Sequence, residues 1–196
     1  MKTKSHNLLT VAAGSMLLAS CGPHLSSTTV PMSSAQAPPA SVSHGDGSLA
    51  GKIHAGVNSY RSSIGREALP RHTGLDRMAR QHSEFMRQNR GKFKLGTSAN
   101  ISHYGFNERA LAAQRLMGMS NVAENVATCS GRGNQSAPTL VNAWKNSSGH
   151  AKSMKGKWDA TGIGVVVDDD GTVFATQIFA NQSHSHMAMT ERMRQF

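Results

Sequence analysis

The chain has 196 residues, with 21 Lys and Arg against 11 Asp and Glu, which gives a formal net charge of +10. Two cysteines cannot build the disulfide framework of a small exported scaffold, so a hydrophobic core must supply the stability. The basic residues are scattered, without interleaved aromatics or a nucleic-acid motif. The charge therefore predicts attraction to anionic surfaces and argues against a nucleic-acid partner.

The N-terminus has the pattern of an export signal. Two lysines precede an apolar run from Leu8 to Ala19, which is shorter than the about 20 residues of a membrane-spanning helix. The run ends at Leu18-Ala19-Ser20-Cys21, which resembles the bacterial lipobox, in which the Cys becomes the lipidated first residue of the mature protein. We expect a lipoprotein signal peptide over residues 1–20 and a membrane anchor at Cys21. Ordinary secretion, with cleavage nearby, is the alternative.

Composition divides the rest of the chain into three parts. Residues 21–48 are rich in Ser, Pro and Ala and have too few large apolar residues to fold, so we expect a disordered tether. Residues 49–182 have the length of one domain. Residues 183–196 are expected to form a flexible tail, in which His184 and His186 are solvated.

Hydrophobic spacing predicts four helices in the domain. The first carries apolar residues at steps of four, three and four, namely Ile53, Val57, Tyr60 and Ile64. The second begins at Thr73, with Asp76 completing an approximate capping box, and ends before Gly91. The third runs from Asn107 as N-cap to Met117, with Leu111 and Leu116 expected to face inward. The fourth spans 137–146 and has a proline in its first turn.

The last third of the domain changes to the pattern of strands. Residues 162–167 are rich in β-branched side chains, three aspartates and Gly171 form a turn, and residues 172–179 return as the next strand. A third strand is expected over residues 122–128. Helices followed by an antiparallel hairpin predict an α+β domain with layered helices and sheet.

A carboxylate lies within the apolar third strand. Glu124 in Ala123-Glu124-Asn125-Val126-Ala127 is costly to bury unless it is paired, hydrogen-bonded or bound to metal. His103 and His150 are the candidate partners, and two imidazoles with one carboxylate and an open position are a catalytic type of zinc ligand set. The competing interpretations are a Glu124–His103 pair or a turn cap, and for His150 an N-cap or turn residue. His82, on an apolar helix face, is expected to be a hydrogen-bonded core residue.

Five motifs in order identify a family. They are Ser102-His103, the run around Glu124, Trp144 to His150, Gly162-Ile163-Gly164-Val165 and Thr176-Gln177-Ile178-Phe179. The succession resembles the bacterial branch of the CAP superfamily, which includes sperm-coating proteins, pathogenesis-related proteins and venom allergens. The resemblance implies an α–β–α sandwich whose central cleft is lined by two His and two Glu and, in several members, holds a divalent cation.

The resemblance carries over to only half of this tetrad. His103 takes the place of the first His and Glu124 that of the first Glu, whereas Ser147 and Phe174 stand where the eukaryotic pattern has its second Glu and second His. His150 follows the bacterial pattern. A zinc or magnesium ion held by His103, Glu124 and His150 is therefore expected to be weakly bound and exchangeable.

Three functions follow from these features. The favoured hypothesis is a lipid-anchored envelope protein whose cleft binds a small ligand, a lipid or a divalent cation, with Gly22 after the Cys favouring the outer membrane in a Gram-negative cell. The second is an envelope interaction protein whose basic surface contacts an anionic wall polymer and whose cleft is vestigial. The third is a hydrolase that uses the His/Glu pair as general base and Ser102, Ser147 or Ser148 as nucleophile, although no nucleophile-elbow motif is present.

Overall fold

The computed structural model describes residues 48–93, 101–131, 133–183 and 192–193. The chain divides into two units, Met1–Ala37 and Pro38–Phe196, and all the described residues belong to the second. The predicted signal peptide, the lipidation site Cys21, almost the whole tether and the histidines of the tail lie outside the described residues. None of the helices within the described ranges is long and apolar enough to cross a membrane.

Helices and strands follow in the order that the sequence predicts, with one additional helix. The elements are α1 (Leu49–Ser63), α2 (Thr73–Gln88), α3 (Phe106–Met117), β1 (Met119–Cys129), the 3-10 turn η1 (Gly133–Gln135), α4 (Ser136–Asn146), α5 (Ser148–Lys155), β2 (Ala160–Val167) and β3 (Val173–Gln182). The segment around Ser147–His150, read from the sequence as a turn, forms the start of α5.

The three strands form one antiparallel sheet in the order β1-β3-β2. β3 is central because it pairs with β2 through the tight turn at Gly171 (φ 81°) and with β1 along its other edge. Glu124 lies opposite Ile178, and the next residue, Asn125, lies opposite Gln177. Since side chains alternate across a strand, Glu124 and Asn125 face opposite sides of the sheet.

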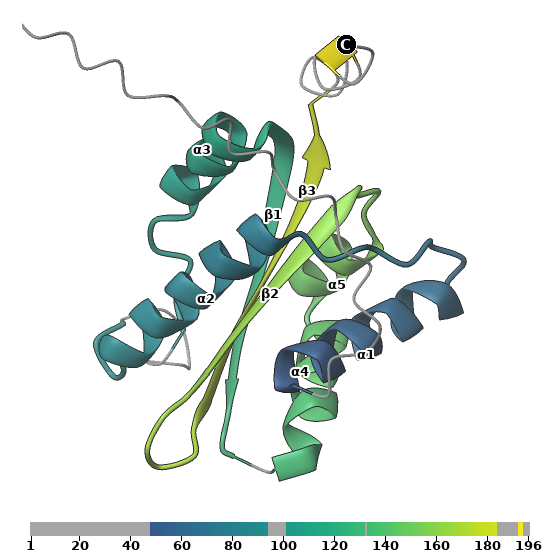
Figure 1. Cartoon of the computed structure of the whole chain (residues 1–196). Helices are drawn as coiled ribbons and strands as arrows, with labels where there is room; N and C mark the ends of the chain where they lie inside the picture. The colour runs from purple at the N-terminus through teal and green to yellow at the C-terminus, as the bar shows by residue number, and fades with distance from the viewer. Residues whose placement is uncertain (1–47, 94–100, 132, 184–191, 194–196) are drawn as a thin grey trace, which may run out of the picture. The chain divides into compact units, whose positions relative to one another are not determined.

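Helices cover both faces of this sheet, which confirms the predicted α–β–α sandwich (Figure 1). One layer contains α2 and α3, whose core residues pack with Ile178 and Ala180 of β3. The other layer contains α1, α4 and α5, and its core includes the completely buried Trp144 and Phe179. Each face of β3 is covered, so all of its residues from Val173 to Ala180 are buried.

Four local predictions about the helices were wrong. The N-cap of α3 is Gly105, not Asn107, which lies inside the helix. Ile64, expected on the apolar face of the first helix, is the C-cap of α1 and is 41% exposed. His72, not a capping box at Thr73, caps α2, because its Nδ1 accepts the N–H of Leu75 at 3.3 Å. Asp76 instead accepts the backbone N–H of Ile163 at 2.8 Å and so ties α2 to β2. In α3, the expected inward residues Leu111 and Leu116 are 45% and 81% exposed, whereas the buried position is Ala113.

Candidate functional site

The site is built around the carboxylate of Glu124, whose side chain is 1% exposed. Arg109, from the first turns of α3, binds it with two parallel hydrogen bonds, Nε to Oε2 and Nη2 to Oε1, each 2.8 Å. His103 Nδ1 lies 3.0 Å from Oε1. A bidentate guanidinium and an imidazole N–H together satisfy the buried charge, and such charge-assisted bonds are the strong ones in proteins.

His103 connects this buried charge to solvent. An ionised carboxylate only accepts hydrogen bonds, so the proton between His103 and Glu124 belongs to Nδ1. In the neutral ring Nε2 is then an acceptor, and the side chain is 49% exposed. Glu124 thus fixes both the tautomer and the orientation of an accessible imidazole.

His82 is the buried histidine of the cluster. It is 3% exposed, its Nε2 donates to the carbonyl oxygen of Ser102 at 2.7 Å, and the same nitrogen lies 3.8 Å from Glu124 Oε1. This confirms the prediction of a hydrogen-bonded core histidine. Burial lowers the pKa of His82 more than the attraction of Glu124 raises it, so the ring is neutral at neutral pH.

The charge of Glu124 is maintained against its burial. Burial alone would raise the pKa of this carboxyl, but the hydrogen bonds from His103 and Arg109, with the charge of Arg109, lower it below the ordinary value of 4.5. The side chain is therefore ionised at neutral pH. The carboxylate–guanidinium pair leaves the centre of the site close to electrically neutral.

His150 lies beside His103 and has no described contact with Glu124. It lies near the start of α5, and the two imidazole ring centroids are 6.2 Å apart. The side-chain amide of Asn125 donates to the backbone carbonyl of His150 at 3.2 Å, which holds α5 against β1. Burial lowers the pKa of His150, with a smaller contribution from His103. The structure thus places the three predicted residues in one region, with a direct bond only between His103 and Glu124 among the contacts described.

This arrangement does not fit a three-ligand metal centre that includes Glu124. Both carboxylate oxygens already accept hydrogen bonds from Arg109, whose positive charge stands where a cation would bind. Within the described ranges, no group of three or more His, Cys, Asp or Glu side chains is placed to hold a metal ion. Zinc or magnesium binding here stays a prediction.

A row of stacked aromatic rings lies beside the cluster. The ring of Phe85 stacks on His82 with a centroid distance of 5.9 Å and on Tyr104 at 5.6 Å, both at an interplanar angle of 15°. Next to this stack is a pocket of about 260 Å³, whose apolar walls are Met78, Phe85 and Tyr104 and whose polar lining includes His82 and Arg109. The pocket therefore shares two residues with the site around Glu124.

Arg109 and the aromatic stack were missed by sequence reasoning. The sequence did contain one signal for Arg109. A buried carboxylate requires a cation or several hydrogen-bond donors, and α3, which carries Arg109, directly precedes β1 in the chain. Tyr104 directly follows His103 in the chain and is 71% exposed, which is unusual for an aromatic ring of this size. Its stacking on Phe85 depends on tertiary structure alone.

Acid should destabilise the domain in two steps. His82 and His150 have lowered pKa values in the folded state, so the unfolded chain binds more protons below the ordinary value of 6.5 and stability is lost as pH falls from there. Glu124, also lowered, adds a second loss below 4.5. Urea unfolding between neutral pH and about pH 3 measures both steps. His82→Gln should reduce the first step, to which His150 and His72 still contribute because burial lowers their pKa values too. A wild-type curve that stays level down to pH 5 would contradict the burial of a neutral His82.

Similarity to known proteins agrees with this geometry. The family model for the cysteine-rich secretory protein family, CAP, matches residues 54–179, which is more than half of the chain. No curated protein matched the sequence. Among solved structures, an outer surface protein from Borrelia burgdorferi is similar with a TM-score of 0.54 and 16% identity, over 67% of this chain and 90% of that chain.

A second bacterial structure shows the same fold. It is a cysteine-rich secretory protein from Staphylococcus aureus, with a TM-score of 0.50 and 18% identity. The match covers 68% of this chain but only 38% of that one. With two cysteines, this sequence can form at most one internal disulfide, although the matched family is named for cysteine-rich proteins. Because the sandwich, the order of its elements and the family match agree, the chain belongs to the CAP family.

Proposed function

We propose that the chain is an exported, lipid-anchored protein of the bacterial cell envelope whose CAP domain binds a small ligand beside Glu124. Support for the location comes from the signal-like pattern that ends at Cys21. The similar proteins from B. burgdorferi and S. aureus are described as an outer surface protein and a secretory protein, respectively. The same location is proposed for this chain.

The observation that carries the binding function is the pocket that joins the aromatic stack to the charged cluster. Phe85 and Tyr104 offer ring faces for the apolar part of a ligand. Arg109 has five N–H donors and uses three of them, two on Glu124 and one on the carbonyl of Tyr104 at 2.8 Å. The remaining donors suit a carboxylate, sulfonate or hydroxyl. The ligand is therefore a small molecule or lipid fragment with an apolar body and a polar, preferably anionic, end.

Binding is favoured over catalysis by the state of Ser102, the candidate nucleophile that precedes His103 in the chain. The Ser102 hydroxyl oxygen accepts the backbone N–H of Tyr104 at 3.0 Å and so closes a local turn. His103 and Glu124 have the geometry of a general base and its orienter, but an oriented imidazole also serves as a hydrogen-bond partner for a bound ligand. We therefore assign the pair to ligand binding.

The aromatic stack can be tested with anilinonaphthalene sulfonate, a fluorescent probe with fused rings and an anionic group. We expect saturable binding to the folded full chain, weakened at least about tenfold by Tyr104→Ala because the ring face is lost. The free energy of unfolding should change little, because Tyr104 is 71% exposed. Leu116→Ala, at an 81% exposed position on α3, is the control and should bind the probe normally.

The same assay examines the metal prediction. Zinc or magnesium that displaces the probe from the wild type, but not from His103→Ala, would support a cation at the cluster. Equal probe affinity in the wild type and Tyr104→Ala would refute the proposed pocket.

A further inference from the structure

The charges of this domain are divided unequally between its two helical layers. Residues 48–66 and 125–158 contain no Asp or Glu, and these two stretches include the whole of α1, α4 and α5. In the described part of the chain, the ion pairs lie elsewhere. They join Arg71 to Asp76, Arg87 to Glu84 and Asp168, Arg90 to Asp168 and Asp170, and Arg109, His103 and His82 to Glu124. The positive charge of the α1–α4–α5 layer is therefore not neutralised within the layer.

Four exposed lysines carry this charge, and they are called here the lysine layer. They are Lys52 on α1, Lys145 on α4, and Lys152 and Lys155 on α5. The contacts described for two of them are with uncharged groups. Lys52 Nζ donates to the side-chain oxygen of Asn134 at 3.2 Å, and Lys145 Nζ lies 5.3 Å from the ring centroid of Tyr60. Both ammonium groups are thus positioned while their charge is kept.

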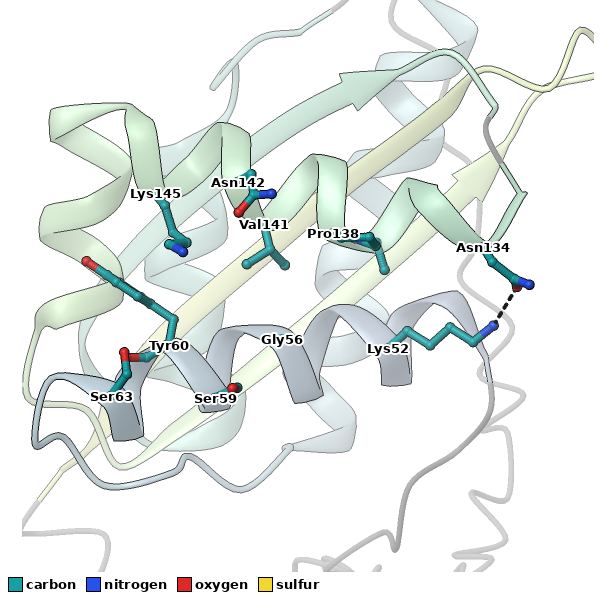
Figure 2. Close-up of a pocket in the computed structure, with 11 residues that line it drawn as sticks. Lys52, Gly56, Ser59, Tyr60, Ser63, Asn134, Pro138, Val141, Asn142 and Lys145 are labelled. Carbon is teal, nitrogen blue, oxygen red and sulfur yellow. Dashed lines mark hydrogen bonds between the residues drawn. The ribbon is translucent and has the colours of Figure 1, made fainter.

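A groove between α1 and α4 connects two of these lysines. It has a volume of about 490 Å³, and Figure 2 shows Lys52 and Lys145 at its opposite ends. Its floor contains small or apolar residues such as Gly56 and Val141. Ala137 and Pro138 add further apolar surface, and hydroxyl and amide side chains line the remainder of the groove, namely Ser59, Tyr60, Ser63, Asn134 and Asn142. Such groups exchange hydrogen bonds with sugar hydroxyls, whereas the terminal ammonium groups attract anions.

We propose that the lysine layer is a docking surface for an acidic polysaccharide, with the groove between α1 and α4 holding a short stretch of the chain. Two cations at the ends of a groove with both apolar and hydroxyl- or amide-bearing walls suit a linear polymer that carries carboxylate or phosphate groups on its sugars, because sugar rings present apolar faces as well as hydroxyl groups. This surface is separate from the pocket beside Phe85, since the two share no lining residue. The proposal therefore does not depend on whether the pocket beside Phe85 binds a small ligand.

A membrane surface fits this layer less well. Proteins that lie on membranes add apolar anchors to a basic patch. Among the described residues, the exposed large apolar side chains are Ile64, Tyr104, Leu111, Leu116, Val167 and Met193, and of these only Ile64, the C-cap of α1, adjoins α1, α4 or α5. The hydroxyl and amide groups in the groove and the scarcity of apolar anchors on this layer favour a glycan.

The test compares two variants of the full chain that lose the same charge. The first replaces all four residues of the lysine layer with Gln. The matched control replaces Arg77, Arg80, Lys92 and Arg115 with Gln, which are exposed and lie outside the α1–α4–α5 layer. Binding is measured to alginate as the carboxylate-bearing polysaccharide, to neutral dextran, and to phosphatidylglycerol vesicles, at about 0.1 M salt.

We expect the wild type to bind alginate and not dextran. The lysine-layer variant should lose at least about tenfold in affinity, since four charges on the docking surface are removed together. The control should lose less than about threefold. Equal losses in both variants would overturn the proposal, because only net charge would then matter. Vesicle binding that exceeds alginate binding and depends on the lysine layer would overturn it in favour of a membrane.

Discussion

Replacing Arg109 with Met is expected to lower the free energy of unfolding by about 3–5 kcal/mol at neutral pH. Met keeps much of the apolar stem of Arg109 but removes both hydrogen bonds to Glu124. The carboxylate, which is 1% exposed in the folded domain, would keep only His103 as a strong donor. Urea unfolding monitored by circular dichroism measures the loss.

Two further variants show whether the loss comes from the buried charge. Glu124→Gln in the Arg109→Met background should recover part of the stability, since a neutral amide costs less to bury than an unpaired carboxylate. Arg87→Met is the matched surface control, because Arg87 pairs with Glu84 where both side chains are about one-third exposed. It should destabilise the domain far less than Arg109→Met, because water screens an exposed ion pair. An Arg109→Met variant that loses no more than this control would mean that water reaches Glu124.

The role of Arg109 also shows where sequence reasoning stopped. The bonded pair of Glu124 and His103 could be predicted, because an acid in an apolar run needs a partner and the family pattern supplied one. For α3, the prediction relied on its leucines as the buried face. The helix instead turns Arg109 and Ala113, four residues apart, toward the sheet, and Leu111 is left exposed. The orientation of α3 therefore satisfies the need of Glu124 for a cation, and it does not bury the largest apolar residues of the helix.

The sequence analysis did not predict α5, and the physical reason is a different one. In α5, only Ala151 and Met154 are buried among eight residues, so the sequence has no sustained hydrophobic period. The helix is held by tertiary contacts, including the bond from Asn125 to the carbonyl of His150. The strands were easier to predict, since β-branched residues and the aspartate–glycine turn mark the hairpin locally. Their positions in the sheet, with β3 at the centre, follow from long-range pairing that a local pattern does not contain.

Gly164→Ala is expected to be the most disruptive single methyl addition in the domain. Gly164 faces α2, and a Cβ placed there would overlap the backbone nitrogen of Arg80 and the backbone carbonyl carbon of Ala79. Backbone atoms of a helix cannot move aside like the end of a flexible side chain, so α2 as a whole must shift away from β2. We expect a loss of at least about 3 kcal/mol of unfolding free energy, at the upper end for overpacked cores. Urea unfolding measures it.

Gly149→Ala supplies the matched control, because no atom other than those of its chain neighbours and the backbone of α5 lies within 4 Å of a Cβ at that position. It should be neutral or stabilise the domain by up to about 1 kcal/mol, since Ala favours a helix more than Gly does.

Gly164→Ala should also affect the binding site. α2 carries both His82 and Phe85, so a shift of α2 would separate the aromatic stack from Arg109 and weaken binding of the fluorescent probe. Wild-type stability of Gly164→Ala, with unchanged probe binding, would mean that α2 and β2 do not approach as closely as the structure shows.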